Sequence, residues 1–361
     1  MSETLTTLAQ ATPEWLTATL QANGTLSYGR VEAIAQRAVG ASSQVAYLTI
    51  RYSADAPSAA PIDLLLKIAD PELEQRMPRR NRAEIAFYSA LATTPRALPV
   101  VRSYSARYAV GNPDRFHLLL ADPTATTHIA CPYSAAPPTM EQSTAIIDAL
   151  ARIHAHCWDD QGLGAQLQAA RPAELQSGTL TEAFIPWATE AVPRFISDLG
   201  DRLTARQRDV YRQIGATIPA RLVVRQNTGR ALTLTQGDVH RGNFLYPRDS
   251  TTDTTLVIDW KRAGVTVGAN DLAYMMALYW FPAIRAQREQ TLLRRYHEQL
   301  CSHGVTNYSW DDLWEDYRLC VLRQFFEAVW GWSVRQNSTI WWNHLERITL
   351  AIEDLNCRAF L

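Results

Sequence analysis

Two aspartates and one asparagine in the C-terminal half have types and spacing that suit metal binding and proton transfer. Asp238 is followed five positions later by Asn243, and Asp259 ends the apolar run TTLVID sixteen positions after Asn243. Carboxylate and amide oxygens are hard ligands that suit magnesium, and a carboxylate can also accept the proton of a hydroxyl group. The alternative is that Asp238 and Asn243 are turn residues, because both types favour turns.

The residues around these three extend the pattern. QGDVHRGNFLY, residues 236–246, is followed by VIDW at residues 257–260. Together they resemble the HGD-x-x-x-x-N…IDW pattern of aminoglycoside phosphotransferases and of the related choline-kinase-like and ecdysteroid-kinase-like families. NDLAYMM, residues 270–276, resembles the Asp-Leu-Ala helix start of the same families. The resemblance implies an ATP- and magnesium-dependent kinase that phosphorylates a hydroxyl group of a small molecule.

The resemblance also implies a role for each of the three residues. Asp238 becomes the catalytic base, and Asn243 and Asp259 become metal ligands. Gln236 stands where the family usually has histidine; because glutamine also forms hydrogen bonds, we expect it to brace the loop. His240, two residues after the aspartate, is a candidate contact to the substrate or a phosphate, without an assigned catalytic role.

A kinase also needs a lysine that neutralises phosphate charge and a glutamate that holds the lysine. Lys67 ends the apolar run of IDLLLKIAD and, in a strand, points away from the side of Leu66 and Ile68. Glu84 lies 17 residues later on the apolar stripe of a predicted helix, where a carboxylate needs a cation. We therefore expect Lys67 to pair with Glu84 and to contact the nucleotide. The alternative is that both side chains are solvated.

Two further segments are candidates for nucleotide contacts. Residues 39–43 resemble the small, serine-rich loop that covers the phosphates in the family, so Ser42 and Ser43 are candidate phosphate donors. An ordinary hairpin turn is the alternative. RFHLLLADPTA resembles the strand and hinge, where Asp122 keeps one of the family's two acidic positions. Pro123 has no backbone N–H and cannot donate to adenine.

Signals in the N-terminal third predict two helices and a small antiparallel sheet. Residues 13–23 form the first predicted helix, between a start signal and a stop signal. Three runs rich in β-branched and aromatic residues follow within residues 29–70, and two more lie within residues 100–122. Residues 80–94 have helical spacing. These elements must position Lys67, Glu84 and the hinge.

The rest of the chain is mainly helix-like, and helices do not alternate with strands, which argues against a doubly wound parallel sheet. We predict an α+β fold, and the resemblance implies that it is protein-kinase-like and two-lobed. Residues 1–122 are predicted to form an N-lobe with an N-terminal helix and a nucleotide-binding antiparallel sheet plus one helix. Residues 123–361 are predicted to form a helical C-lobe with the catalytic loop and the acceptor site.

Composition indicates a globular protein and argues against several classes of partner. Of the 361 residues, 47% are hydrophobic and 20% are charged, and the formal net charge of -1 gives no basic excess for nucleic acid. No apolar stretch is long enough to span a membrane, and the N-terminus lacks the pattern of a signal peptide. Five scattered cysteines without a C-x-x-C motif suit a reducing compartment. We expect a cytoplasmic protein with neither a nucleic-acid nor a membrane partner; the oligomeric state is open.

The Trp-rich helical segment over residues 271–350 is the predicted wall of the acceptor site. Four acidic residues in it predict a preference for neutral or cationic acceptors, and the alternative is that they form a solvated helix N-terminus. These are Asp311, Asp312, Glu315 and Asp316.

Two other functions stay open. A protein kinase is the weaker one, because only 12 residues separate Asp259 from Asp271 and leave little room for an activation segment. The other is a nucleotide-binding, kinase-like regulatory protein without transfer activity. The sequence does not choose the acceptor.

Overall fold

The computed structural model describes most of the chain: residues 4–39, 44–69, 82–91, 98–109, 111–131, 136–160, 162, 165 and 184–361. The chain divides into two compact units. The first comprises Met1–Ala130, Gly162–Gln176 and Leu245–Ala263, and the second comprises Cys131–Gln161, Ser177–Phe244 and Gly264–Leu361. The predicted lobe boundary between residues 122 and 123 stays a prediction.

Helix α1 (Pro13–Ala22) follows the short 3-10 helix η1 (Leu8–Gln10) in the first unit. Its N-cap is Thr12, whose side chain accepts a hydrogen bond from Trp15 N at 3.2 Å. Just beyond its end, Gly24 has a φ of +75°, a conformation that glycine adopts without strain. The predicted helix over residues 13–23 is therefore confirmed.

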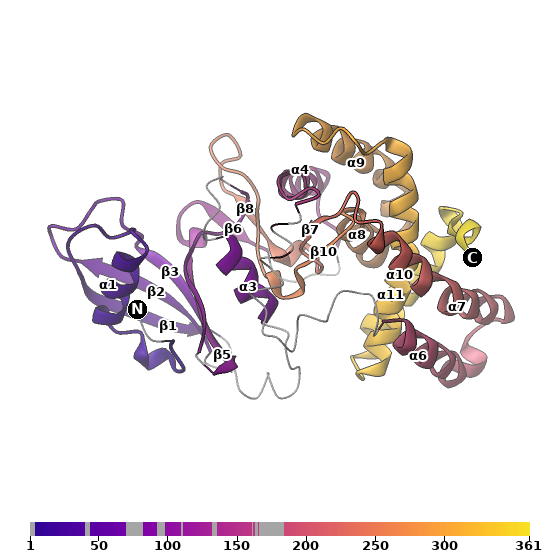
Figure 1. The fold of residues 1–361 in the computed structure, drawn as a ribbon, viewed down its shortest axis with the longest axis horizontal. Coiled ribbons are helices and arrows are strands. Elements are labelled where there is room, and N and C mark those ends of the chain that lie inside the picture. Colours follow the sequence, from indigo (N-terminus) through magenta and orange to yellow (C-terminus); the bar gives the residue numbers. More distant parts are fainter. Residues whose placement is uncertain are drawn as a thin grey trace. The chain divides into compact units, whose positions relative to one another are not determined.

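A five-stranded antiparallel sheet forms the centre of the first unit (Figure 1), with strand order β1-β2-β3-β5-β4. Its strands are β1 (Val31–Val39), β2 (Val45–Tyr52), β3 (Asp63–Ile68), β4 (Ser103–Ala109) and β5 (Asn112–Ala121). The five predicted strand-like runs correspond to these strands, so the predicted α+β class is confirmed.

Strand β3 shows how the sheet separates its two faces. Leu64 and Leu66 are fully buried and share one hydrophobic core with Leu16 and Leu20 of α1. Lys67 follows Leu66 and is only half-buried, because successive side chains of a strand point to opposite faces. Helix α1 thus covers one face, and Lys67 projects from the other.

Helix α3 (Arg82–Leu91) and a smaller sheet complete the first unit. That sheet has the strand order β6-β8-β9, formed by β6 (His128–Ala130), β8 (Phe244–Pro247) and β9 (Leu256–Val257). Asp259 comes two residues after β9 and directly before η6 (Trp260–Arg262). The buried Trp260 ring stacks on Phe87 of α3, with ring centroids 3.9 Å apart and planes at 10°. This stacking fixes the Asp259 segment against α3.

The second unit is mainly helical (Figure 1). Its longer helices are α4 (Met140–His156), α6 (Phe184–Leu199), α7 (Ala205–Asn227), α9 (Pro282–Ser302), α10 (Trp310–Ser333) and α11 (Ser338–Asp354). Two short strands, β7 (Thr233–Thr235) and β10 (Gly264–Thr266), pair antiparallel. Helix α8 (Ala269–Ala273) continues into a buried π-helical turn, η7 (Tyr274–Leu278).

Four further 3-10 turns complete the described elements: η2 (Pro123–Ala125), η4 (Gly200–Arg202), η5 (Arg241–Asn243) and η8 (Cys357–Phe360). Across the described ranges, no helix has both the length and the apolarity needed to cross a bilayer.

Candidate active site

Lys67 and Glu84 form the ion pair that the sequence predicts. Lys67 Nζ lies 2.9 Å from Glu84 Oε1 and 3.2 Å from Oε2, and the Glu84 side chain is only 3% exposed. Burial by itself lowers the pKa of Lys67, but the negative charges of Glu84 and Asp259 outweigh burial, and the net shift is upward. The ammonium group therefore stays charged. A glutamate on the buried stripe of α3 is tolerated because this cation faces it.

Asp259 lies in the same unit and in an unusual backbone conformation. Its φ of 58° and ψ of 69° are left-handed, which costs a non-glycine residue on the order of 1 kcal/mol. The stacked Trp260 beside it, whose indole N–H donates to Val257 O at 3.2 Å, holds the backbone there. Lys261 Nζ lies 3.2 Å from Asp259 Oδ2. The carboxylate is therefore placed close to two lysines, one of which already holds Glu84.

The loop that carries Asp238 is held by a buried carboxylate in the second unit. Asp271, which is fully buried at the start of α8, accepts hydrogen bonds from Gln236 N at 2.7 Å and from Gly237 N at 2.9 Å. His154 Nε2 lies 3.4 Å from Asp271 Oδ2. Gly237 has a φ of +79°, so glycine suits the turn that presents both N–H groups. Asp271 is thus a structural partner of the loop, although the sequence only marks it as a helix start.

Two side chains inside the loop fix the backbone of Asp238. Gln236, which is fully buried, accepts the Asp238 N–H on Oε1 at 2.7 Å, so it braces the loop as expected for the residue that replaces histidine. Asn243 Nδ2 donates to Asp238 O at 2.8 Å. Because the Asn243 amide nitrogen is engaged there, its oxygen points away from that carbonyl and is the atom suited to a metal.

The Asp238 carboxylate has an aromatic neighbour that the sequence does not reveal. Tyr274, the first residue of the π-helical turn, donates its hydroxyl to Asp238 Oδ1 at 2.7 Å. His240 Nε2 lies 3.9 Å from Asp238 Oδ2. The ring of Tyr279 lies 5.4 Å from that of Tyr274 and 5.7 Å from that of His240. The only sequence signal for Tyr274 is its place in NDLAYMM, which gives no partner.

The structure describes only some of the other residues that are predicted to contact the nucleotide. Ser42 and Ser43 lie outside the described residues. Asp122 Oδ1 accepts from Thr124 N at 3.0 Å and caps η2, and Asp122 N donates to Asp63 O at 2.9 Å. The carboxylate therefore has a local structural role, and its contact with a nucleotide stays a prediction.

The side-chain oxygens of Asn243 and Asp259 are of the chemical type that magnesium prefers as ligands. In the residues that the structure describes, no group of three or more histidine, cysteine or carboxylate side chains could hold a metal ion. Magnesium in a phosphotransferase needs only one or two protein oxygens, because phosphate and water supply the others. The Asn243 amide oxygen and the Asp259 carboxylate are oxygen donors of this type, and their role as metal ligands stays a prediction. The two residues belong to different compact units.

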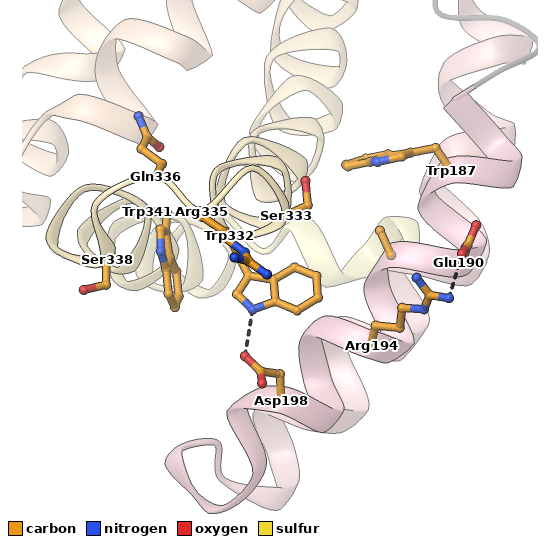
Figure 2. A pocket seen from close by; sticks show the side chains of 11 residues that line it. Trp187, Glu190, Arg194, Asp198, Trp332, Ser333, Arg335, Gln336, Ser338 and Trp341 are labelled. Carbon is orange, nitrogen blue, oxygen red and sulfur yellow. Dashed lines mark hydrogen bonds and ion pairs between the residues drawn. The ribbon is translucent and has the colours of Figure 1, made fainter. Parts of the chain in front are cut away.

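A pocket of about 740 Å³ lies between α6 and the junction of α10 with α11. Figure 2 shows indole rings on both walls, with Trp187 on α6 and Trp332 and Trp341 opposite. The Trp332 indole N–H donates to Asp198 Oδ2 at 2.8 Å. The Trp-rich segment thus lines a pocket large enough for a drug-sized molecule.

One face of α11 and two ring contacts relate Trp341 of this pocket to Tyr274, the partner of Asp238. Trp341 and His344 are three residues apart on α11 and therefore lie on one face. The His344 ring lies 5.1 Å from that of Tyr279, which neighbours Tyr274. Burial, and then the charge of Arg347, lower the pKa of His344 to about 4, so this connecting ring is neutral near pH 7.

Two of the acidic residues expected to favour a cationic acceptor have structural partners instead. Asp312 forms a capping box with Ser309 at the start of α10. Asp316 accepts two hydrogen bonds from Arg225, each 2.7 Å long. For Asp312 the structure agrees with the alternative of a helix N-terminus, whereas Asp316 is buried in an internal ion pair, which neither alternative predicts.

Comparisons with known proteins agree with the motifs. Residues 132–305 match the sequence model of the ecdysteroid kinase-like family, which confirms the resemblance drawn from the catalytic loop. No curated protein matches the chain.

Three solved structures have a similar fold at low sequence identity. Plasmodium vivax ethanolamine kinase has a TM-score of 0.52 at 9% identity, with 91% of this chain and 83% of that chain covered. A Ralstonia eutropha protein provisionally assigned as an aminoglycoside phosphotransferase has a TM-score of 0.55 at 14% identity, with 94% and 97% covered. An aminoglycoside phosphotransferase from Alicyclobacillus acidocaldarius has a TM-score of 0.51 at 11% identity, with 91% of both chains covered. The predicted protein-kinase-like fold is confirmed.

Proposed function

We propose, from the match of residues 132–305 to the ecdysteroid kinase-like family, that this protein is an ATP-dependent kinase that phosphorylates a hydroxyl group of a small molecule. The observation that supports this function best is the bracing of Asp238. Its backbone is held by Gln236 and Asn243, and its carboxylate is held by Tyr274. A turn residue without a catalytic role has no need of such support from three side chains.

The proposed reaction is a direct phosphoryl transfer. The acceptor hydroxyl oxygen attacks the γ-phosphorus of ATP, the bond from that phosphorus to the bridging oxygen breaks, and ADP leaves with the bond's electron pair. Asp238 takes the hydroxyl proton and later releases it to solvent. The products are a phosphate monoester, ADP and a proton.

The other predicted residues position the nucleotide in this proposal. Lys67, held by Glu84, contacts the phosphates, and Asn243 and Asp259 would hold magnesium, which neutralises phosphate charge when bound. Ser42, Ser43 and Asp122 stay candidates for further contacts to the nucleotide. We also propose a cytoplasmic location, supported by the free state of all five cysteines in the structure.

The tryptophan pocket is the proposed site for the body of the acceptor. Three indole rings offer apolar and aromatic surface. Trp341 shares a face of α11 with His344, whose ring contacts that of Tyr279, and Tyr279 in turn contacts Tyr274 beside Asp238. We therefore propose a neutral or cationic alcohol with a substantial apolar part, since aromatic faces bind both apolar groups and cations.

The alternative function is a nucleotide-binding, kinase-like regulatory protein without transfer activity. One assay separates the two: ADP formation with Mg·ATP and a panel of aminoglycosides, choline, ethanolamine, sugars, steroid alcohols and homoserine, with ³¹P NMR of the product. We expect a phosphate monoester from at least one acceptor and none from Asp238→Asn. Nucleotide binding without ADP formation from any acceptor or from water would favour the regulatory alternative.

A further inference from the structure

The two carboxylate oxygens of Asp238 have different surroundings. Oδ1 accepts a hydrogen bond of 2.7 Å from the Tyr274 hydroxyl. Oδ2 lies 3.9 Å from His240 Nε2, which exceeds the length of a direct hydrogen bond. Tyr274 is buried, whereas the side chains of His240 and Asp238 are 16% and 19% exposed. The side of the carboxylate that a hydroxyl group from solvent can reach is therefore the Oδ2 side.

The backbone of the loop selects the tautomer of His240. Gly242 N donates to His240 Nδ1 at 3.2 Å, in the manner of a helix N-cap on η5. A ring nitrogen that accepts a hydrogen bond carries no hydrogen, so the neutral imidazole carries its hydrogen on Nε2. His240 therefore places an N–H donor next to the reachable oxygen of Asp238.

The separation between this donor and this acceptor suits one bridging hydroxyl oxygen. An oxygen atom about 2.8 Å from both Nε2 and Oδ2 subtends roughly 90° between atoms that are 3.9 Å apart. In that position the hydroxyl accepts from the imidazole N–H and donates its proton to Oδ2. One lone pair of the oxygen stays available for attack on phosphorus.

We infer that His240 is a catalytic residue that holds the acceptor oxygen against Asp238 Oδ2, and that Tyr274 is a positioning residue that occupies Oδ1. This inference rests on the proposed kinase function and names the atoms that receive the acceptor. His240 donates a hydrogen bond and takes no proton; the hydroxyl proton goes to Oδ2 while the oxygen forms its bond to phosphorus. Fixing both atoms of the proton transfer lowers the barrier through orientation.

The π-helical turn explains why a tyrosine can reach this carboxylate. Tyr274 follows α8 directly. Asp271, which holds the backbone of the loop, lies near the start of α8. A π-helical turn widens the helix at that point, which is a feature often found at functional sites. One short segment, residues 271–274, thereby holds both the backbone of the loop and one oxygen of its base.

The test uses variants that remove the donor and keep the fold. His240→Asn removes the N–H next to Oδ2 but retains an oxygen that can cap Gly242 N–H, because asparagine is a favoured N-cap residue. Tyr274→Phe removes only the hydroxyl. The matched controls are His297→Asn, whose Nε2 bonds Tyr308 O at 2.9 Å, and Tyr211→Phe, whose hydroxyl bonds Thr349 at 2.6 Å.

The rate of ATP hydrolysis with water as the only acceptor is measured together with the Kd of Mg·AMPPNP by calorimetry. We expect His240→Asn and Tyr274→Phe to lower the rate roughly 10- to 100-fold with a Kd within about twofold of wild type, since positioning acts on turnover. Both controls should keep the wild-type rate.

Three results would overturn the inference. The first is a wild-type rate in His240→Asn, and the second is a loss of Mg·AMPPNP affinity that accounts for its slower rate, which would assign His240 to the phosphates. The third is a His240 ring with its hydrogen on Nδ1 in ¹⁵N NMR of the free protein. By contrast, a wild-type protein that neither hydrolyses ATP nor phosphorylates any alcohol would contradict the proposed function itself.

Discussion

Replacing Asp271 by asparagine tests whether the hold on the loop backbone sustains catalysis. Each Asp271 oxygen accepts one backbone N–H, Oδ2 at 2.7 Å from the buried Gln236 N and Oδ1 at 2.9 Å from the part-buried Gly237 N. Asparagine keeps one acceptor and turns an NH₂ group toward the other N–H. A hydrogen bond to a charged group contributes about 1.5–3 kcal/mol, and a buried donor left without a partner costs about 1–3 kcal/mol. We therefore expect a loss of unfolding free energy of about 3–5 kcal/mol.

The matched control is Asp316→Asn. Asp316 is also buried, and it accepts two hydrogen bonds from Arg225 and one from Tyr308, away from the loop. Urea unfolding should show a similar loss of stability in both variants. Under conditions where both remain folded, only Asp271→Asn should lower kcat, by roughly 100-fold, because only this change lets Asp238 move. A kcat within about twofold of wild type in Asp271→Asn would refute the link between the hold on the backbone and catalysis.

Three other predictions follow from the described contacts. Glu84→Gln removes the charge that holds Lys67, so the Kd of Mg·ATP should rise about tenfold in calorimetry; an unchanged Kd would contradict the role of the pair. Asp259→Ala should weaken Mg·nucleotide binding, whereas Asp238→Ala should leave it intact and lower kcat by roughly 10²-fold, and equal loss of binding in both would contradict the division of roles. Burial lowers the pKa of His117 in the folded state to about 4, below its usual value of about 6.5. As the pH drops from about 6.5 to 4, the unfolded state therefore binds a proton that the folded state does not, and the stability of the fold decreases. His117 should account for about 2 kcal/mol of the stability lost between pH 7 and pH 5 in urea unfolding, and His117→Gln should lose about 2 kcal/mol less than wild type over this range. His344, whose pKa is lowered in the same way, should contribute its own loss in both proteins.

A contact can be predicted from the sequence where the periodicity of a strand or helix determines which way a side chain faces. Lys67 and Glu84 can be paired from the sequence alone because a strand alternates its side chains and a helix repeats every 3.6 residues. Each residue therefore has a defined face. The buried stripe that carries Glu84 requires a cation, and Lys67 is the charged candidate at the end of the apolar strand. The structure places the two charges 2.9 Å apart.

Contacts that depend on tertiary packing cannot be predicted in the same way. Tyr274 reaches Asp238 from 36 residues further along the chain, through a π-helical turn that has no recognisable sequence period. Asp316 bonds Arg225 across 91 residues and two helices. No local pattern relates such residues, so the acids around Asp316 suggest a binding surface as readily as an internal ion pair.

Gln236 shows which property of the loop the fold requires. The group that it satisfies is the part-buried N–H of Asp238, and a neutral oxygen at 2.7 Å does so. The charged acceptor for the loop backbone is instead Asp271, which accepts from the N–H groups of Gln236 and Gly237. Because the carboxylate holds one side of the turn and the amide the other, the residue before Gly-Asp needs only to accept a hydrogen bond. Glutamine in place of histidine therefore conserves the backbone geometry at Asp238, since that geometry depends on an acceptor atom at this position and not on an imidazole ring.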